Sequence, residues 1–466
     1  MTARWHRRRG LAGLIAVIVA ALAAPACTST ISGTAHSTEP VWVKAPDAHV
    51  KVDGTDNGQS DQIAENSISD IQMYWKTEMP KVFNEQYAPV SGGFYSIDPR
   101  NATSLPCQAT RADISGNAFY CPKEDLVVWD RTTLLPQLAT RYGDYTIALV
   151  LAHEWGHAIQ KRAITRTERT IVRETQADCF AGAFTRWAYD GHAPHFKPNG
   201  KQLDESLAGF LNFADPLGVT QSTQGAHGNA FDRVTALQEG YDKGPAFCAS
   251  SANFNDSRQF TELPFTTSNE QVSRGNLPIG DALTQGNGDL QKYWATVLTK
   301  DYHKTWTKPS KVDIYSGASG PSCDGSITDK TIAFCAGDNN KIVVQKTPGM
   351  QSIYNGSGDY GPMVLLATAY AMTARHELGR STDDQNGLLG SVCLAGVYTA
   401  RLFNNTKTNA KNQLQLSPGD LDEAIQALLL GVNDQAFDGP QGTTGFQRVN
   451  VFSQGVLNGF KPCNSY

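Results

Sequence analysis

The sequence contains one group of residues whose spacing suits metal-assisted hydrolysis, His153-Glu-Trp-Gly-His157. On an α-helix a spacing of four residues puts both imidazoles on one face, where they can bind a single zinc ion. Glu154 lies beside them without being a ligand, and a carboxylate there can take a proton from an attacking water and pass it to a leaving amine. The motif therefore predicts a zinc site with Glu154 as the catalytic base. The alternative is a helix with two surface histidines, but the apolar neighbours at 148–152 favour a buried face, where unpaired polar groups are costly.

A catalytic zinc ion needs a third protein ligand and one open position. Downstream, the pattern predicts a second helix over residues 170–189, with Glu174 and Asp178 on one face. One carboxylate can bind the metal while the other orients a ligand histidine, and we assign Glu174 to the first role and Asp178 to the second. The alternative is a solvated acidic face balanced by Arg169 and Arg173.

Five segments recur in the same order at a near-constant spacing along the chain. The paired segments begin at Asp70 and Asp289, Ala118 and Ala333, Asp144 and Asp359, Cys179 and Cys393, and Arg233 and Arg448. This repetition predicts two homologous domains, residues 61–250 and 281–466, joined by a loop-rich linker at residues 251–280. We therefore expect an α+β protein of two tandem domains, mainly helical with a small sheet and disulfide clips.

The cysteines follow the same repetition. When Cys27 is set aside, the other eight fall four to each repeat, and identical pairing in both repeats leaves three connectivities. The favoured pairing clips a short hairpin loop in each repeat and ties its central helix to its C-terminal end: Cys107–Cys121, Cys323–Cys335, Cys179–Cys248 and Cys393–Cys463. Free buried thiols are the alternative.

The second repeat lacks the residues that would bind a metal. Opposite His153, Glu154, His157, Glu174 and Asp178 it carries, in the same order, Thr368, Ala369, Met372, Leu388 and Val392. We therefore expect one zinc ion per chain, in the first repeat, and a catalytically degenerate second domain whose core is packed with apolar side chains. Three roles are open for that domain: substrate docking, shielding of the first domain's cleft, and binding of a protein partner.

Three segments of the first repeat resemble a bacterial family, the neutral zinc metallopeptidases, which include cell-envelope lipoprotein peptidases of actinobacteria. The segments are His153–Gln160, Glu174–Gly182 and Phe119–Pro122 followed by Asp130. The resemblance covers about residues 90–250. It implies a zincin-like domain of the gluzincin type, in which His153, His157 and Glu174 bind zinc and Glu154 is catalytic. It also implies hydrolysis of peptide bonds, without identifying a substrate.

A further segment, His227-Gly228 followed by Arg233 and Gly240, is similar to a His-Gly segment near the end of that family's domain. Two roles for His227 follow from this similarity. As a catalytic residue it would hydrogen-bond the tetrahedral oxyanion, and as a structural residue it would order its loop.

The N-terminus is typical of an export signal. Residues 1–26 contain a basic region ending at Arg9 and then an apolar stretch too short for a good membrane span. Cys27 resembles the lipidated cysteine of a bacterial lipoprotein, although Ala24 stands where such proteins usually have leucine. We expect a lipidated Cys27, a flexible tether over residues 27–60, and a location at the outer face of the cytoplasmic membrane. Secretion is the alternative if Cys27 is not lipidated.

Composition narrows the classes of function. Hydrophobic residues at 40% and charged residues at 18% exclude a collagen, a coiled coil and a polytopic membrane protein, and a net charge of −5 argues against nucleic acid as a partner. The sequence thus predicts an exported, membrane-anchored zinc metallopeptidase acting on a peptide or protein of the cell envelope, with cell-wall peptide included. The alternative is an envelope interaction or scaffold protein whose zinc is not catalytic.

Overall fold

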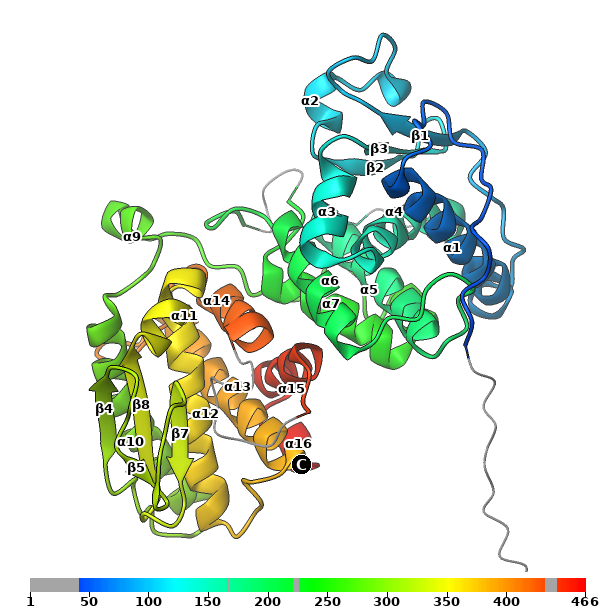
Figure 1. Ribbon diagram of the computed structural model, residues 1–466. Coiled ribbons are helices and arrows are strands. Elements are labelled where there is room, and N and C mark those ends of the chain that lie inside the picture. Colours follow the sequence, from blue (N-terminus) through cyan, green and yellow to red (C-terminus); the bar gives the residue numbers. More distant parts are fainter. Residues whose placement is uncertain (1–41, 166–167, 221–225, 432–441) are drawn as a thin grey trace, which may run out of the picture. The chain divides into compact units, whose positions relative to one another are not determined.

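Each half of the chain places a small three-stranded sheet beside its own group of helices (Figure 1). The computed structural model describes residues 42–165, 168–220, 226–431 and 442–466. We call residues 43–250 the first half and residues 279–466 the second half. The expected signal segment 1–26 and Cys27 lie outside the described residues.

The first half begins with a long helix and continues with strands before its central helices. Its strands are β1 (Gly93–Ile97), β2 (Ala118–Cys121) and β3 (Leu126–Asp130). Its helices are α1 (Gln59–Phe83), α2 (Arg111–Ile114), α3 (Leu134–Tyr142), α4 (Tyr145–Ala163), α5 (Thr170–Tyr189), α6 (Gly200–Phe210), α7 (Ala230–Lys243) and α8 (Pro245–Ala249), with short 3₁₀ turns at Pro106–Gln108 and Leu211–Phe213. Helix α5 has the bounds that the sequence predicts.

The second half repeats this order after the short helix α9 (Ser268–Ser273). Its strands are β4 (Val312–Ser316), β5 (Ser322–Cys323), β6 (Ser326–Ile327), β7 (Ile332–Cys335) and β8 (Lys341–Thr347). Its helices are α10 (Ile279–Asp301), α11 (Gly349–Ser357), α12 (Tyr360–Glu377), α13 (Gln385–Lys407), α14 (Asp420–Gln426), α15 (Gly445–Asn458) and α16 (Phe460–Cys463), with a π-helical turn at Ala427–Gly431.

The two three-stranded sheets have the same topology. In the first, β3 is central, parallel to β1 and antiparallel to β2; in the second, β8 is central, parallel to β4 and antiparallel to β7. All five residues of β3 are buried. Val127 and Trp129 join the main core, whereas Leu126 and Val128 face a smaller cluster around a disulfide, as expected for alternate residues of a strand covered on both faces. The expected α+β class is confirmed.

Helix α4 is buried on nearly every side because its first half is an uninterrupted apolar run, Ile147–Ala152. Gly156 then allows α5 to approach closely, since a Cβ atom at this position would lie 2.7 Å from Cα of Ala177. The glycine inside the histidine motif therefore sets the distance between the two helices that carry the predicted ligands.

Helices α5 and α7 also meet backbone to backbone through glycine. A Cβ atom at Gly240 would lie 1.8 Å from the carbonyl oxygen of Cys179. The second half has the same contact, because a Cβ atom at Gly455 of α15 would lie 2.0 Å from the carbonyl oxygen of Cys393 on α13. Any larger side chain at either glycine would force these helices apart.

All four predicted disulfides are confirmed: Cys107–Cys121, Cys179–Cys248, Cys323–Cys335 and Cys393–Cys463. The two long-range bridges enclose almost equal stretches of chain, with sequence separations of 69 and 70. Each ties its half's central helix to the helical C-terminal end of that half.

The predicted tether over residues 27–60 is wrong in its last part. From Val43 onward the chain belongs to one compact unit that extends to Tyr466. Val52 is buried, the backbone of Ala48 donates to the Asn66 side chain at 2.8 Å, and Asp53 forms a bridge with Tyr95 of β1. Polar composition suggested flexibility here, but these polar groups have partners on α1 and the sheet.

The predicted linker at residues 251–280 is also more ordered than its composition suggests. Phe254 and Phe260 are buried in the main core, and Thr267 caps α9 by accepting from the Glu270 amide. Its early part is bound to α7 of the first half, through Arg258 to Glu239 and Thr261 to Asp232, whereas the amide of Leu277 donates to Asp359 of the second half.

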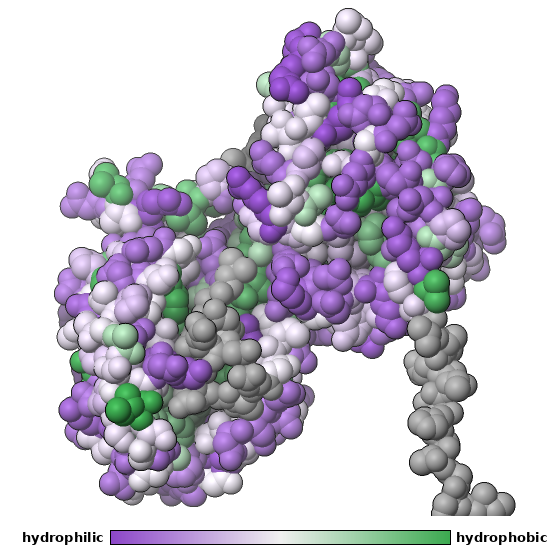
Figure 2. Space-filling view, viewed as in Figure 1, coloured by the Kyte–Doolittle hydropathy of each residue, from purple (hydrophilic) through white to green (hydrophobic). Residues whose placement is uncertain are grey.

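None of the helices in the described ranges is long and apolar enough to cross a membrane. Figure 2 shows mostly hydrophilic residues on the visible face, with hydrophobic ones scattered between them. The large hydrophobic side chains are instead gathered in the core.

Candidate active site

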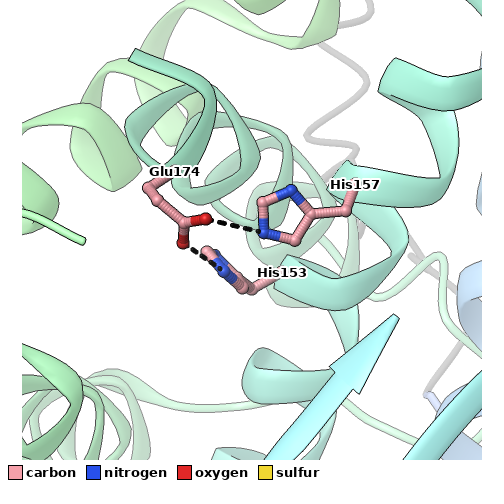
Figure 3. Close-up of side chains that lie close together, drawn as sticks. All are labelled: His153, His157 and Glu174. Atoms are coloured by element: carbon pink, nitrogen blue, oxygen red, sulfur yellow. Dashed lines mark ion pairs between the residues drawn. The ribbon is translucent and has the colours of Figure 1, made fainter. Parts of the chain in front are cut away.

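The structure brings the three predicted metal ligands together between α4 and α5 (Figure 3). The Glu174 carboxylate lies between the two imidazoles, with one oxygen 3.4 Å from Nε2 of His153 and the other 3.4 Å from Nε2 of His157. One donor atom from each residue lies within 4.8 Å of the other two. The spacing of four in α4 and the close approach of α5 at Gly156 are the two causes of this arrangement.

The remaining ring nitrogens already have partners that hold the imidazoles in place. Nδ1 of His153 lies 2.6 Å from Oδ1 of Asp178, and Nδ1 of His157 lies 3.0 Å from Oε1 of Gln160. With both Nδ1 atoms engaged, both Nε2 atoms point toward Glu174. Two imidazole nitrogens and one carboxylate, each oriented by a neighbour, are a donor set that fits a catalytic zinc ion. Asp178 has the orienting position that the sequence predicts.

Asp178 is itself held by Arg233 of α7. The guanidinium donates to both carboxylate oxygens, at 2.9 and 2.8 Å, and Arg233 and Asp178 are buried. The same guanidinium lies over the ring of Phe210 and donates to the carbonyl of Phe213. Sequence reasoning assigned no role to Arg233, and only the packing of α7 on α5 shows that it supports a ligand histidine.

The acidic and basic groups of the site shift one another's pKa. Burial acts to lower the pKa of His153, but the Asp178 and Glu174 carboxylates outweigh it and raise that pKa to about 10. Burial acts to raise the pKa of Glu174, but the two imidazoles outweigh it and hold that pKa well below its usual value. Glu174 is therefore ionised and faces two imidazoles that hold protons. A metal cation can take the place of those protons.

Glu154 lies beside the ligands and is fixed by the sheet. Its Oε2 atom accepts a hydrogen bond of 2.8 Å from the backbone amide of Tyr120 in β2. Burial raises the pKa of Glu154, although the neighbouring imidazoles act against this effect. A desolvated carboxylate with a raised pKa is better suited to accept and return a proton than a solvated one.

These residues open into a cavity of about 430 Å³. Its wall includes the predicted residues His153, Glu154, His157, Glu174 and His227, together with residues to which sequence reasoning gave no role: Asn117, Ala118, Tyr120, Val150, Glu168, Thr170, Arg173, Phe210, Phe213 and Arg233. Residues 117–120 are the outer edge of the sheet, since β2 pairs with β3 on one side only. The segment Phe119–Pro122 was the available signal for this wall.

The structure places His227 in the wall of the cavity, and its surroundings fit both predicted roles. Asp215 accepts from the backbone amides of His227 and Gly228, each at 2.7 Å, and lies 3.4 Å from Nδ1 of His227. The contact between the Asp215 carboxylate and the His227 ring raises the pKa of His227. Asp215 therefore orders the loop, and the half-exposed imidazole is left beside the site.

In the described part of the chain, helices α12 and α13 of the second half hold no such group of donors. The aligned residues are all buried: Thr368, Ala369, Met372, Leu388 and Val392. Thr368 donates its hydroxyl hydrogen to the carbonyl of Val364 within α12. Among the residues that the structure describes, those between α12 and α13 form no donor set that could hold zinc.

Comparison with known proteins agrees with the geometry. Residues 3–244 match the family model described as "putative neutral zinc metallopeptidase". The uncharacterized protein YpfJ of Escherichia coli (strain K12) is 31% identical over 177 residues, covering 32% of this chain and 58% of that protein. The uncharacterized protein Rv2575 of Mycobacterium tuberculosis is 28% identical over 160 residues, covering 28% of this chain and 53% of that protein.

The chain thus matches little more than half the length of these relatives. No solved structure matches it significantly. Since the family model spans more than half of the sequence and includes every residue of the metal site, the chain belongs to the neutral zinc metallopeptidase family.

Proposed function

We propose that this protein is a zinc-dependent peptidase whose chemistry is confined to the first half. The observation that carries the proposal is the position of Glu154, a buried carboxylate held by the sheet beside three metal-binding side chains in one cavity. Zinc held by His153, His157 and Glu174 would make a water molecule more acidic and polarise a substrate carbonyl.

The chain's own residues then handle the proton. Glu154 takes a proton from water as the water oxygen attacks the carbonyl carbon, and gives that proton to the amine nitrogen as the carbon–nitrogen bond breaks. The amide of Tyr120 holds one oxygen of Glu154 through both steps. His227 donates a hydrogen bond to the oxygen that becomes negative when the carbonyl is attacked.

The edge of the sheet supports a peptide substrate. Strand β2 pairs with β3 along one side, and its other side faces the cavity that contains Glu154. An extended peptide can add to such an edge through main-chain hydrogen bonds, which would place a backbone carbonyl near the metal ligands. This mode selects peptides over other amides without requiring a particular side chain.

We further propose that the second half is a degenerate copy of the first, produced by internal duplication. The equal sheet topologies, the glycine contacts between equivalent helices and the equivalent disulfides support this origin. On this proposal the chain binds one zinc ion, and the second half docks substrate, shields the cleft or binds a protein partner.

The location belongs to the same proposal. Residues 1–26 would direct export, and a lipid on Cys27 would anchor the chain at the outer face of the cytoplasmic membrane. Four disulfides are consistent with an oxidising compartment. The substrate would then be a peptide or protein of the cell envelope.

The test compares the zinc-loaded chain with its Glu154→Gln variant on a peptide library read by mass spectrometry. We expect cleavage to fall by about 10²–10⁴-fold in the variant while zinc stays near one ion per chain. Glu85→Gln, at an exposed glutamate of the same half, is the matched control and should cleave normally. Cleavage that persists in Glu154→Gln, or an inactive wild-type chain that binds zinc, would contradict the proposal.

A further inference from the structure

Three carboxylates meet in the second half, far along the sequence from the zinc ligands. Asp359 immediately precedes α12, and Asp420 and Glu423 lie on α14. One oxygen atom from each residue lies within 4.8 Å of the other two. All three residues are buried, with exposed fractions of 5–6%.

The hydrogen bonds of the cluster leave one of its oxygen atoms without a partner. Both oxygens of Asp420 accept from Ser417, one from the amide at 2.9 Å and one from the hydroxyl at 2.7 Å. Asp359 accepts through Oδ2 from the amide of Leu277, and Glu423 accepts through Oε2 from the amide of Tyr360. The other oxygen of Asp359, Oδ1, is buried and has no hydrogen-bond partner in the described part of the chain. The Asp359 side chain lies within hydrogen-bonding reach of the Glu423 carboxylate, so the unpaired oxygen belongs to a side chain that faces a second acid.

No side-chain cation offsets these charges. Among the described residues, the three acids take part in none of the ion pairs, whereas Asp289 and Asp338 of the same half each pair with a basic residue. Three desolvated carboxylates without a counter-charge are costly, and a bound cation removes that cost.

The backbone makes room for this arrangement. Gly358 has φ of +99°, and a Cβ atom there would lie 2.1 Å from Oε1 of Glu423. A residue with a side chain at this position would both strain the backbone and displace the carboxylate. Cavities of about 750 and 690 Å³ reach the cluster, the first along Asp359 and Asp420 and the second along Glu423. Water and small ions therefore have a path to it.

We propose that Asp359, Asp420 and Glu423 bind a calcium ion. All donors are oxygen atoms, which selects a hard cation and disfavours zinc. Calcium accepts six to eight oxygen ligands in flexible geometry, so three carboxylates and water from the adjoining cavities suit it. Magnesium requires a near-ideal octahedron with shorter bonds. This geometry is harder to build from two carboxylates on one short helix and a third beside another helix.

Calcium at this site has a consequence for the first half. Between Asp420 and Glu423 on α14 lies Asp422, which accepts from the amide of Phe231 at the start of α7 at 2.9 Å. Two residues further along α7, Arg233 holds Asp178. A bound calcium ion fixes α14 and thereby supports the end of α7 from which Arg233 extends.

The test uses the full zinc-loaded chain with free zinc held constant, titrated with calcium chloride by calorimetry and followed by thermal unfolding. We expect one calcium ion per chain and a rise of at least about 2 °C in the unfolding midpoint. Glu423→Gln and Asp420→Asn should lose both effects. The matched control Asp329→Asn, at an acid whose side chain is 83% exposed, should keep them.

The variants also distinguish a calcium site from a cluster of acids that is stabilised only by protonation. Without calcium, Glu423→Gln should be at least as stable as wild type, because it removes a charge that is then unpaired. The proposal is overturned if the wild-type chain neither binds calcium nor is stabilised by it at a concentration of about 10 mM. This concentration is well above the dissociation constants of extracellular calcium modules. An equal stabilisation of Glu423→Gln, or a larger effect of magnesium than of calcium on wild type, would also overturn it.

Discussion

The helix pair α4 and α5 and the helix pair α12 and α13 are packed in the same way around opposite kinds of centre. Where the first pair has Glu174 and Asp178, the second has Leu388 and Val392 at the equivalent positions of the sequence repeat. Both centres are well packed, although one is built from charges and the other from methyl groups. The difference teaches that the members of a buried polar centre depend on one another, because removing one leaves the others unpaired.

An arginine follows these helices in each half. Arg233 of α7 makes a paired hydrogen bond to Asp178, whereas Arg448 of α15 donates to the carbonyl oxygens of Leu428 and Thr443. Both arginines are buried. Arg233 thus fixes a member of the metal site from a buried place between helices, and Arg448 lies at the equivalent place in the second half.

The largest effect is expected from Glu174→Leu, which gives the first half the residue type that the second half has at Leu388. Glu174→Leu removes one of three ligands and the anion that balances the imidazoles, so zinc binding and peptide hydrolysis should both be lost. Zinc is measured by mass spectrometry of the metal content and hydrolysis by cleavage of a peptide library. The surface variant Glu85→Leu serves as control, and zinc retained near one ion per chain in Glu174→Leu would contradict the ligand assignment.

The next effect concerns His227, whose aligned position in the second half is Gly442. If the imidazole stabilises the oxyanion, His227→Ala should lower kcat by about 10²–10³-fold with little change in KM or zinc content. Asp215→Asn, which perturbs the loop and keeps the imidazole, should act mainly on KM and stability. A variant His227→Ala with normal kcat and reduced stability would leave His227 with the structural role alone.

The reverse exchange tests the apolar centre. Leu388→Glu puts a carboxylate at a buried position now filled by an apolar side chain, so the free energy of unfolding should fall by roughly 3–5 kcal/mol. Urea denaturation measures this change, and Leu388→Met is the control because it keeps apolar volume. If Leu388→Glu were tolerated and bound zinc, the second half would still contain a usable metal site.

The smallest effect concerns the first turns of α7 and α15. Asp232 of α7 is buried and accepts from Thr261, and burial raises its pKa from 3.8 to about 7. The aligned residue of α15 is Gln447, which cannot ionise and completes a capping box with Thr444. Only the first of these helices therefore carries a pH-sensitive residue at this position.

Because the folded-state pKa is raised, the stability that protonated Asp232 contributes is present below about pH 4 and is lost as the pH rises through 7. The slope is about 1 kcal/mol per pH unit between pH 5 and 7. Asp232→Asn should flatten this part of the profile, measured by urea denaturation at each pH. An unchanged slope in the variant would show that other groups determine the pH dependence.

Local spacing alone predicted a large part of this protein. The histidine pair follows from the helical period, and Glu174 and Asp178 follow from the same period on the next helix. The internal repetition predicted all four disulfides and the loss of ligands in α12 and α13. These features are accessible because each depends on residues a few positions apart or on a comparison of the chain with itself.

Tertiary structure decided which distant groups became partners. The pairing of Arg233 with Asp178, the hydrogen bond from Tyr120 to Glu154 and the meeting of Asp359 with α14 join residues that are 55, 34 and more than 60 positions apart. Residues 43–58 were assigned to a tether for the same reason, since their composition does not show their partners on α1. A polar side chain looks alike in the sequence whether it is solvated or buried, and only packing decides which polar groups lose water and must find each other.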